Sequence, residues 1–369
     1  MASSYPPLHS AALLLLCFCS VFSNAKFLSL PVFKHAVSGR FVARIFQGTH
    51  QRPADLVVDL GGSFTGLDCR GSSTQRVVSC PSLECSKAGE SSGSVGELVE
   101  DAVAVGSQVV DSVNSVDRFL FYCMPKPALR RLPGGGASGV LGLGRSKMSL
   151  PSQFSMTNFL DRKFTICLSA SDGQGQLLIG DALSGTDISK TLIYTPLITS
   201  KEEKHLISVN SIKIEGDPVP VKVNGRARLS TTAPFTTFQS SIYHSFTEKF
   251  VKAVNATKAE SVWPLKTCFV SGTKWPEVDL VLQSKMVKWR IGKRNLVVQQ
   301  VSKGVSCLGI LDGGYEMGDD EIVIGRYQLE EKLLEFDMGR SMLGFKSDGG
   351  MNCGELKLES GMDTHHPSF

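Results

Sequence analysis

The stretch Leu56-Val57-Val58-Asp59-Leu60-Gly61-Gly62 carries the clearest structural signal in the sequence. Its apolar, β-branched half is typical of a buried strand, and its two glycines permit a tight turn. We therefore expect a strand that runs into a polar turn at Asp59. A buried carboxylate needs hydrogen-bond donors, and the backbone N–H groups of the two glycines are the predicted partners of Asp59.

The second half of the sequence contains a similar arrangement. Leu229 leads into Ser230-Thr231-Thr232, a polar turn that follows an apolar residue. A glycine-rich apolar stretch, residues 139–144, begins eighty positions after Asp59, and residues 309–313 begin 79 positions after Ser230. This repetition predicts two similar β lobes with a junction near residues 190–205.

Most of the remaining pattern also indicates β structure. Short runs rich in Val, Ile and Phe lie between Gly, Ser, Asp and Pro residues, which is typical of strands separated by turns. Strands are expected at residues 41–46, 56–60, 97–105, 119–122, 164–168, 176–179, 205–214 and 278–283.

One long helix is predicted, over residues 240–254. Ser240 or Ser241 is its expected N-cap. Apolar residues recur at every fourth position and predict a face that packs on a core, namely Ile242, Phe246, Phe250 and Val254. A shorter helix is expected over residues 329–334, before a strand around Leu343.

Length and composition exclude several classes of protein. The 369 residues suit two domains, and 42% hydrophobic with 20% charged residues argues against a disordered or fibrous chain. A net charge of only +4 gives no case for a nucleic-acid binder, which needs a concentrated basic face. The basic residues of segment 285–294 alternate with apolar ones, so we expect a solvated face of a β-hairpin there. No cofactor is expected, because the glycine spacing at residues 134–139 follows Pro133 rather than a strand.

Residues 1–25 have the pattern of a secretory signal peptide. Their apolar stretch, residues 11–22, is followed by Ser23-Asn24-Ala25, and the segment carries no Lys, Arg, Asp or Glu. The stretch is too short to span a membrane, and no other run of about 20 apolar residues occurs, so we do not expect an integral membrane protein. A buried N-terminal helix is the alternative. The mature chain is expected to be secreted, and Asn255-Ala256-Thr257 forms an N-glycosylation sequon.

Removal of that segment lowers the number of cysteines from ten to eight. An even number in the oxidising secretory pathway predicts four disulfides. A zinc site is the rival interpretation. It is weak because no histidine lies near Cys80 or Cys85 and no second close pair of cysteines exists.

The Asp59-Leu60-Gly61-Gly62 turn resembles the Asp-Thr-Gly-Ser active-site turn of pepsin-like aspartic proteases. It is more similar to the variant found in their secreted plant homologues, which are the xylanase and xyloglucanase inhibitors, basic 7S globulins and extracellular dermal glycoproteins. The resemblance extends along nearly the whole mature chain, through residues 137–145, 149–154, 163–168, 192–197, 229–236, 278–283, 307–309, 323–325 and 343–345.

This resemblance implies a mostly β, bilobal pepsin-like acid-protease fold, with two related β-barrel lobes and a few short helices. Residues 26–195 would form the N-terminal lobe, of the xylanase-inhibitor N-terminal type. Residues 196–352 would form the C-terminal lobe, of the xylanase-inhibitor C-terminal type, and residues 353–369 a tail in which Cys353 is bridged.

The resemblance also implies a set of disulfides: Cys80–Cys85, Cys69–Cys123, Cys268–Cys307 and Cys167–Cys353. Relatives carry a longer, cysteine-rich insert and a flap hairpin after Cys85. Loss of that insert would explain why only eight cysteines remain in the mature chain.

Aspartic proteolysis needs two carboxylates that share one proton and a water. The resemblance places Asp59 at the first dyad position and Ser230 at the second, and a serine hydroxyl cannot replace a carboxylate there. Leu60 also stands where the proteases have a hydroxyl residue that hydrogen-bonds across the dyad. We therefore predict that the dyad is degenerate and that Asp59 is a structural remnant.

Three functions follow from the resemblance, and the fold alone does not choose among them. The first is a secreted, monomeric protein that binds and inhibits plant-wall-degrading glycoside hydrolases of the xylanase or xyloglucanase class. Its inhibitory loops would fall at residues 269–277 and 312–321. The second is an active aspartic-type endopeptidase, against which Ser230 argues. The third is a basic 7S globulin-like protein that binds peptides or serves in storage or defence.

Overall fold

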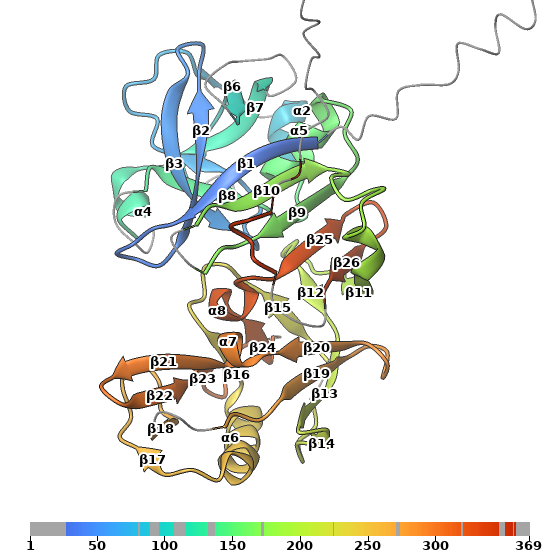
Figure 1. Ribbon diagram of the computed structural model, residues 1–369. Helices are drawn as coiled ribbons and strands as arrows, with labels where there is room; N and C mark the ends of the chain where they lie inside the picture. Colours follow the sequence, from blue (N-terminus) through green and yellow to red (C-terminus); the bar gives the residue numbers. More distant parts are fainter. Residues whose placement is uncertain are drawn as a thin grey trace, which may run out of the picture.

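The computed structural model describes residues 27–79, 82–88, 96–106, 115–131, 137–170, 173–223, 225–270, 274–318, 320–346, 351–356 and 358. The predicted signal peptide and Cys80 lie outside these residues. The described residues form two β-rich lobes on either side of a shared sheet (Figure 1), which confirms the predicted mostly β, bilobal fold. No helix among them is both long and apolar enough to cross a membrane.

Six antiparallel strands form the sheet that joins the lobes. In spatial order they are β1 (Phe27–Lys34), β10 (Gly175–Gly180), β9 (Lys163–Cys167), β25 (Leu333–Asp337), β26 (Met342–Phe345) and β11 (Ile193–Ile198). Every residue of β25 is buried, as expected for a strand covered on both faces. The rings of Phe164 and Phe336 stack across the β9–β25 pair with centroids 4.6 Å apart. The predicted lobe boundary between residues 195 and 196 lies within β11 and stays a prediction.

The N-terminal lobe lies above this sheet in Figure 1. β2 (Phe41–Gln47) and β3 (Arg52–Asp59) form a hairpin beside the antiparallel pair β6 (Glu97–Val105) and β7 (Ser115–Cys123). β3 runs parallel to β8 (Gly139–Gly142), and β4 (Gly66–Leu67) lies between β7 and β8. The remaining elements are β5 (Arg76–Val77), α2 (Leu83–Ala88), α4 (Lys126–Arg131) and α5 (Leu150–Thr157).

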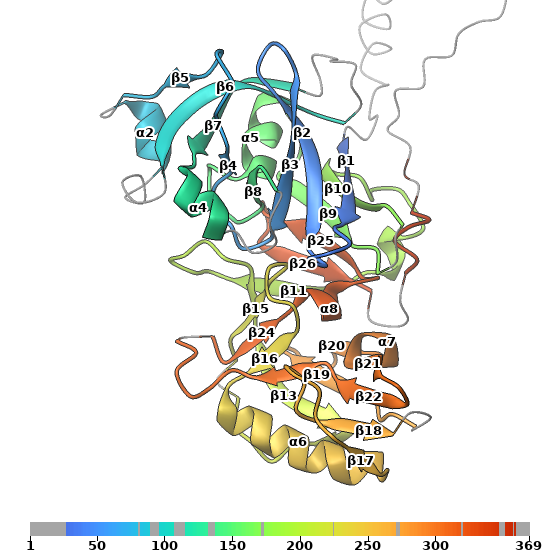
Figure 2. The same cartoon turned by 90° about the vertical axis from the view of Figure 1, so that its left-hand side faces the viewer.

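The C-terminal lobe lies below the sheet, as Figure 2 shows from the side. Next to the sheet are β12 (Leu206–Ile207), β15 (Ala227–Leu229), β16 (Thr236–Phe238), β23 (Ile310–Asp312) and β24 (Ile322–Ile324). A four-stranded sheet has the order β14 (Asp217–Pro218), β13 (Val209–Ile214), β19 (Val278–Leu282) and β20 (Lys288–Ile291). A second one has the order β17 (Lys258–Ala259), β18 (Cys268–Val270), β22 (Val305–Leu308) and β21 (Val297–Ser302). The helical elements are η3 (Ser189–Thr191), which precedes β11, and α6 (Ser240–Val254), α7 (Lys293–Leu296) and α8 (Arg326–Leu329).

The two lobes do contain equivalent strand pairs, but residues 309–313 are not the counterpart of residues 139–144. β3 pairs in parallel with β8, and β15 pairs in parallel with β24, so the counterpart of residues 139–142 is residues 322–325. Residues 310–312 form β23 instead, which pairs in parallel with β16 as β7 pairs with β4. The nearly equal spacings of 80 and 79 residues matched two strands that are not equivalent.

The predicted long helix is confirmed, because α6 spans Ser240–Val254 and buries the four apolar residues that recur every fourth position. Its N-cap is Gln239 rather than a serine, since the Ser240 hydroxyl donates to Asp312 Oδ1 at 2.6 Å. The predicted helix over 329–334 is wrong. α8 ends at Leu329, and Leu333 and Leu334 begin β25, where the buried central sheet requires apolar residues.

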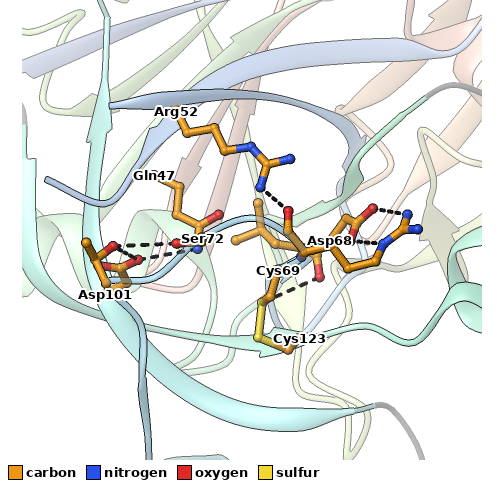
Figure 3. The surroundings of a disulfide bond; sticks show 10 residues. Gln47, Arg52, Asp68, Cys69, Ser72, Asp101 and Cys123 are labelled. Atoms are coloured by element: carbon orange, nitrogen blue, oxygen red, sulfur yellow. Dashed lines mark hydrogen bonds and ion pairs between the residues drawn. A yellow bond between two sulfur atoms is a disulfide. The ribbon is translucent and has the colours of Figure 1, made fainter. Parts of the chain in front are cut away.

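Three disulfides join cysteine pairs that the resemblance implied. Cys69–Cys123 connects the segment after β4 to the end of β7 (Figure 3), Cys268–Cys307 joins the directly paired residues of β18 and β22, and Cys167–Cys353 joins β9 to the C-terminal segment. Cys85 is also disulfide-bonded. These bonds leave none of the described cysteines for the rival zinc site.

The surroundings of Cys69–Cys123 are polar and well paired (Figure 3). Asp101 is buried, and its carboxylate accepts hydrogen bonds from Thr74 Oγ1 at 2.8 Å and from Gln47 Nε2 at 3.3 Å. Asp68, next to Cys69, forms an ion pair with Arg70. The disulfide therefore fixes an edge of the N-terminal lobe. The buried carboxylate near it, Asp101, has hydrogen-bond donors in place.

Removal of Cys167–Cys353 by a double Cys→Ser substitution is expected to lower the free energy of unfolding by about 4–5 kcal/mol. The bond closes a loop with a sequence separation of 186, against 39 for Cys268–Cys307. Because loop-closure entropy grows with loop length, the matched double substitution at Cys268 and Cys307 should cost roughly 1 kcal/mol less. Urea unfolding of both variants measures this, and a larger loss for the shorter loop would contradict it.

Candidate functional site

Asp59 is held at the end of β3 by the turn that follows it. The Gly61 N–H donates to Asp59 Oδ1 at 3.0 Å, and the Gly62 N–H donates to the Asp59 carbonyl at 3.1 Å. A Cβ atom on Gly62 would lie 3.0 Å from Gly142 Cα and 3.2 Å from the Asp59 side chain. Glycine is therefore required at this position because β8 and the carboxylate approach so closely.

Burial and nearby cations shift the pKa of Asp59 in opposite directions. Burial raises the pKa of Asp59 above its ordinary value of 3.8. The Gly61 N–H bond acts in the opposite direction, and so do the positive charges of Arg228 and Lys204, which come from the other side of the lobe junction. Arg228 and Lys204 were not among the predicted site residues.

Ser230 lies at the corresponding turn of the C-terminal lobe, directly after β15. Its N–H donates to the Ile324 carbonyl at 2.9 Å, and its Oγ accepts the Ala233 N–H at 3.1 Å. The same Oγ lies 3.1 Å from Thr232 Oγ1. The hydroxyl of Ser230 thus stabilises its own turn, and among the described residues no hydrogen bond joins it to Asp59.

The two turns are linked by Thr231, a residue whose role the sequence did not reveal. Thr231 Oγ1 accepts the Leu60 N–H at 2.9 Å and donates to the Val58 carbonyl at 2.7 Å. Leu60 and Thr231 are 0% and 1% exposed. Leu60 has no side-chain hydroxyl, and the hydroxyl of Thr231 alone makes two hydrogen bonds between the turns.

The groups that meet here are one carboxyl and one hydroxyl. A carboxylate pair can share a proton because its two members have matched acidities, and this allows one to act as acid and the other as base. The Ser230 hydroxyl has no such acidity near neutral pH. The arrangement therefore lacks the second carboxylate that the reaction of the proteases requires.

His205 is a buried histidine next to this junction. It is 0% exposed, its Nε2 lies 2.9 Å from the Leu143 carbonyl, and its ring packs on Phe164 and Phe336. Burial lowers the pKa of His205 to about 4, so the ring is neutral at physiological pH. Its contacts with the central sheet and with the N-terminal lobe indicate a packing role.

The basic segment around Trp289 contributes the turn and second strand of the β19–β20 hairpin, as predicted, but Lys293 and Arg294 at its end lie in α7. Trp289 is 0% exposed, whereas Lys288 and Arg290 form ion pairs with Asp279. Asp279 thus counters part of the positive charge of this face. Asn255, the asparagine of the sequon, is exposed at the C-terminal end of α6 with a φ of 45°.

Two family models match the chain. The model described as "Xylanase inhibitor N-terminal" matches residues 87–181, and the one described as "Xylanase inhibitor C-terminal" matches residues 204–347. A relative named "Probable aspartic proteinase GIP2" from Nicotiana benthamiana is 36% identical, with 87% of this chain and 89% of that protein covered. The chain belongs to the xylanase inhibitor family.

Other relatives are globulins by name. "Basic 7S globulin 2" of Glycine max is 30% identical, with 89% of each chain covered. Two solved structures, "Crystal structure of Basic 7S globulin from soybean" and "Crystal structure of edgp", superpose with TM-scores of 0.81 and 0.79 at 30% and 32% identity. They cover 90% and 91% of this chain, and 99% and 97% of their own.

The alignment also bears on the missing insert. It spans 394 positions for the Nicotiana relative, more than the 369 residues of this chain, so that family member contains residues that this chain lacks. The predicted loss after Cys85 falls next to residues 89–95, which lie outside the described part of the structure. Its position stays a prediction.

Thr231→Val is expected to lower the free energy of unfolding by about 2–3 kcal/mol, because the buried Leu60 N–H and Val58 carbonyl would both lose their partner. Thr231→Ser keeps the hydroxyl and is the matched control, with a smaller loss. Urea unfolding of the three proteins provides the comparison. Equal stability of the Val and Ser variants would show that the bond across the lobes contributes nothing.

Asp59→Asn is expected to raise the free energy of unfolding at neutral pH and to change it little at about pH 3. The folded-state pKa of Asp59 is raised, so its stabilising contribution is present below 3.8 and is lost as the pH rises through the folded pKa. Asn keeps an acceptor for the Gly61 N–H and does not ionise.

Asp55→Asn, on the same strand, is the control, because the pKa of Asp55 is shifted in the opposite direction from that of Asp59. The Arg44 hydrogen bond lowers the pKa of Asp55, so this carboxylate stabilises the fold above its unfolded pKa. Urea unfolding across the pH range should therefore show a less stable Asp55→Asn protein at neutral pH. A loss of stability in Asp59→Asn at neutral pH would contradict the assignment for Asp59.

Proposed function

We propose that this chain is a secreted, non-catalytic member of the family that binds and inhibits plant-wall-degrading glycoside hydrolases of the xylanase or xyloglucanase class. The observation that carries the proposal is the Ser230 hydroxyl, which caps its own turn; the resemblance assigns this position to the second carboxylate of the dyad. We further propose that the mature chain acts as a monomer outside the cell and is glycosylated at the exposed Asn255. A protein that works by binding needs no second carboxylate.

The loop between β23 and β24 supports a binding role. Asp312, the last residue of β23, is fixed by Ser240 Oγ at 2.6 Å and by the Gly314 N–H at 3.1 Å, and Lys266 forms an ion pair with it at 3.4 Å. Tyr315 follows and is 71% exposed. An exposed tyrosine beside an anchored loop base is a suitable contact residue, because aromatic side chains give large contact areas at small entropic cost.

Two alternatives rest on the names of the relatives. An aspartic endopeptidase is suggested by the name of the Nicotiana relative, but Ser230 argues against it. A peptide-binding, storage or defence protein is suggested by the basic 7S globulins and by "Gamma conglutin 1" of Lupinus angustifolius, which is 30% identical. Neither alternative requires the loop at Tyr315 to contact an enzyme.

The mature protein is expected to cleave no peptide at acidic pH and to inhibit a xylanase or a xyloglucanase. A peptide library, with and without an aspartic-protease inhibitor, tests the first part. Cleavage that the inhibitor blocks and that Asp59→Ala abolishes would establish an active endopeptidase. Titration into xylanase and xyloglucanase assays tests the second part, and no effect at micromolar concentration would favour the storage or peptide-binding alternative.

Tyr315→Ala is expected to weaken that inhibition about tenfold or more, as the truncation of an interface hot spot does. Met286→Ala is the matched control, because Met286 is 88% exposed at the turn between β19 and β20. Inhibition constants of the two variants give the comparison. An equal effect of both substitutions would remove the β23–β24 loop from the interface.

A further inference from the structure

A second feature of the lobe junction is a cavity of about 540 Å³ beside the Asp59 turn. It is bounded by the segment between β11 and β12, by β15, and by the loop that precedes β24. We call it the basic pocket, and its charged lining residues are Lys201, Glu202, Lys204, Arg226, Arg228 and Asp320. Four cations against two carboxylates leave an excess of two positive charges.

The basic pocket is held in place from both lobes. The Arg145 N–H of the N-terminal lobe donates to the Glu203 carbonyl at 2.8 Å, which fixes the segment that carries Lys201 and Lys204. On the other wall, β15 pairs with β12 and with β24, and this fixes the backbone of Arg228; Arg226 directly precedes this strand. A preformed cavity of this size falls in the range of small-molecule sites.

The arginines in the basic pocket already bind one carboxylate of the protein. Arg228 Nε donates to Asp320 Oδ2 at 3.0 Å, and Arg226 Nη2 lies 3.8 Å from Asp320 Oδ1. Arg226 Nε is shielded from solvent and has no hydrogen-bond partner among the described residues. Asp320 therefore does not use every N–H donor of the two arginines, since Arg226 Nε stays available.

We propose that the basic pocket binds a small organic acid with two carboxylate groups. Two carboxylates match the excess of two positive charges, and arginine guanidinium groups recognise planar carboxylates through paired N–H donors. The cavity is larger than one inorganic anion would fill, so an organic ligand accounts for its volume as well as its charge. The uncharged part of the lining consists of Thr199, Ser200, Met317 and Gly318.

Because the basic pocket lies close to Asp59, the pKa of Asp59 can be used to detect a ligand bound there. Arg228 and Lys204 line the pocket and also lower the pKa of Asp59. A bound dianion would neutralise part of their field, so the pKa of Asp59 should rise when the ligand binds. Binding elsewhere on the surface would leave that pKa unchanged.

The test uses calorimetry on the mature protein with malate and digalacturonate as probes, and their methyl esters as uncharged controls. We expect at least one acid to bind, its ester not to bind, and Arg228→Gln and Lys204→Gln each to weaken binding about tenfold or more. Arg340→Gln is the matched control, since the Arg340 side chain is 82% exposed on the turn between β25 and β26. Titration of Asp59 by carboxyl carbon NMR, with and without the acid, should show the rise in its pKa.

Several outcomes would overturn the proposal. One is that no probe acid binds at millimolar concentration, and another is that binding is unchanged in both Arg228→Gln and Lys204→Gln. Inorganic phosphate that binds as tightly as the acids would refute the carboxylate assignment. An unchanged Asp59 pKa in the presence of saturating acid would place the ligand outside the basic pocket. If Arg228→Gln does not fold, Lys204→Gln decides, because its ion pair with Glu202 is on the surface.

Discussion

The hydroxyl of Thr231 makes the two hydrogen bonds that hold the turn of one lobe against the turn of the other. It bonds the backbone on both sides of Asp59, at the Val58 carbonyl and the Leu60 N–H, so the two turns cannot separate without exposing a buried donor and a buried acceptor. The central sheet brings the turns to this distance, because it takes strands from both ends of the chain. Asp59, Ser230 and the basic pocket all owe their relative positions to this junction.

A carboxylate at position 230 would change the electrostatics of the junction. With a hydroxyl there, Asp59 is the single acid of the two turns; it is half-buried, and the cations Arg228 and Lys204 outnumber it. A protease of this fold needs two close carboxylates and the coupled titration that follows. In this chain two turns face each other and are joined by Thr231. They carry one carboxylate, with Arg228 and Lys204 nearby, instead of two carboxylates that share a proton. This arrangement is thus suited to attracting an anion.

Much of the fold could be predicted from the sequence, because its signals are local. The helix over residues 240–254 follows from apolar residues at every fourth position, and the hairpin around Trp289 follows from alternation. The pairing of β15 with β24 could not be predicted, because spacing along the chain does not report which strands become neighbours in a sheet. The helix expected at residues 329–334 failed for a similar reason: its apolar residues are buried by a sheet formed with a segment 170 residues earlier.

At the site, the turns that carry Asp59 and Ser230 could be predicted, but their surroundings could not. Asp59 and Ser230 each follow a recognisable apolar strand, so the sequence marks them. Arg228 and Lys204 carry no such mark, since they act on Asp59 only through the packing of β12 on β15. The role of Thr231 has one local sign, a hydroxyl residue directly after Ser230. Its partners lie more than 170 residues away, at Leu60 and Val58.

The bond between Cys167 and Cys353 makes a covalent ring of half the protein. A peptide bond cut at any point between these residues would open the ring but would not release a fragment. The whole C-terminal lobe between the central-sheet strands β11 and β25 lies within the ring. A nicked chain would therefore stay in one piece, with its lobes still packed on the shared sheet, and would separate only after reduction. In surroundings rich in proteases, the molecule could lose the continuity of its backbone before it loses its shape.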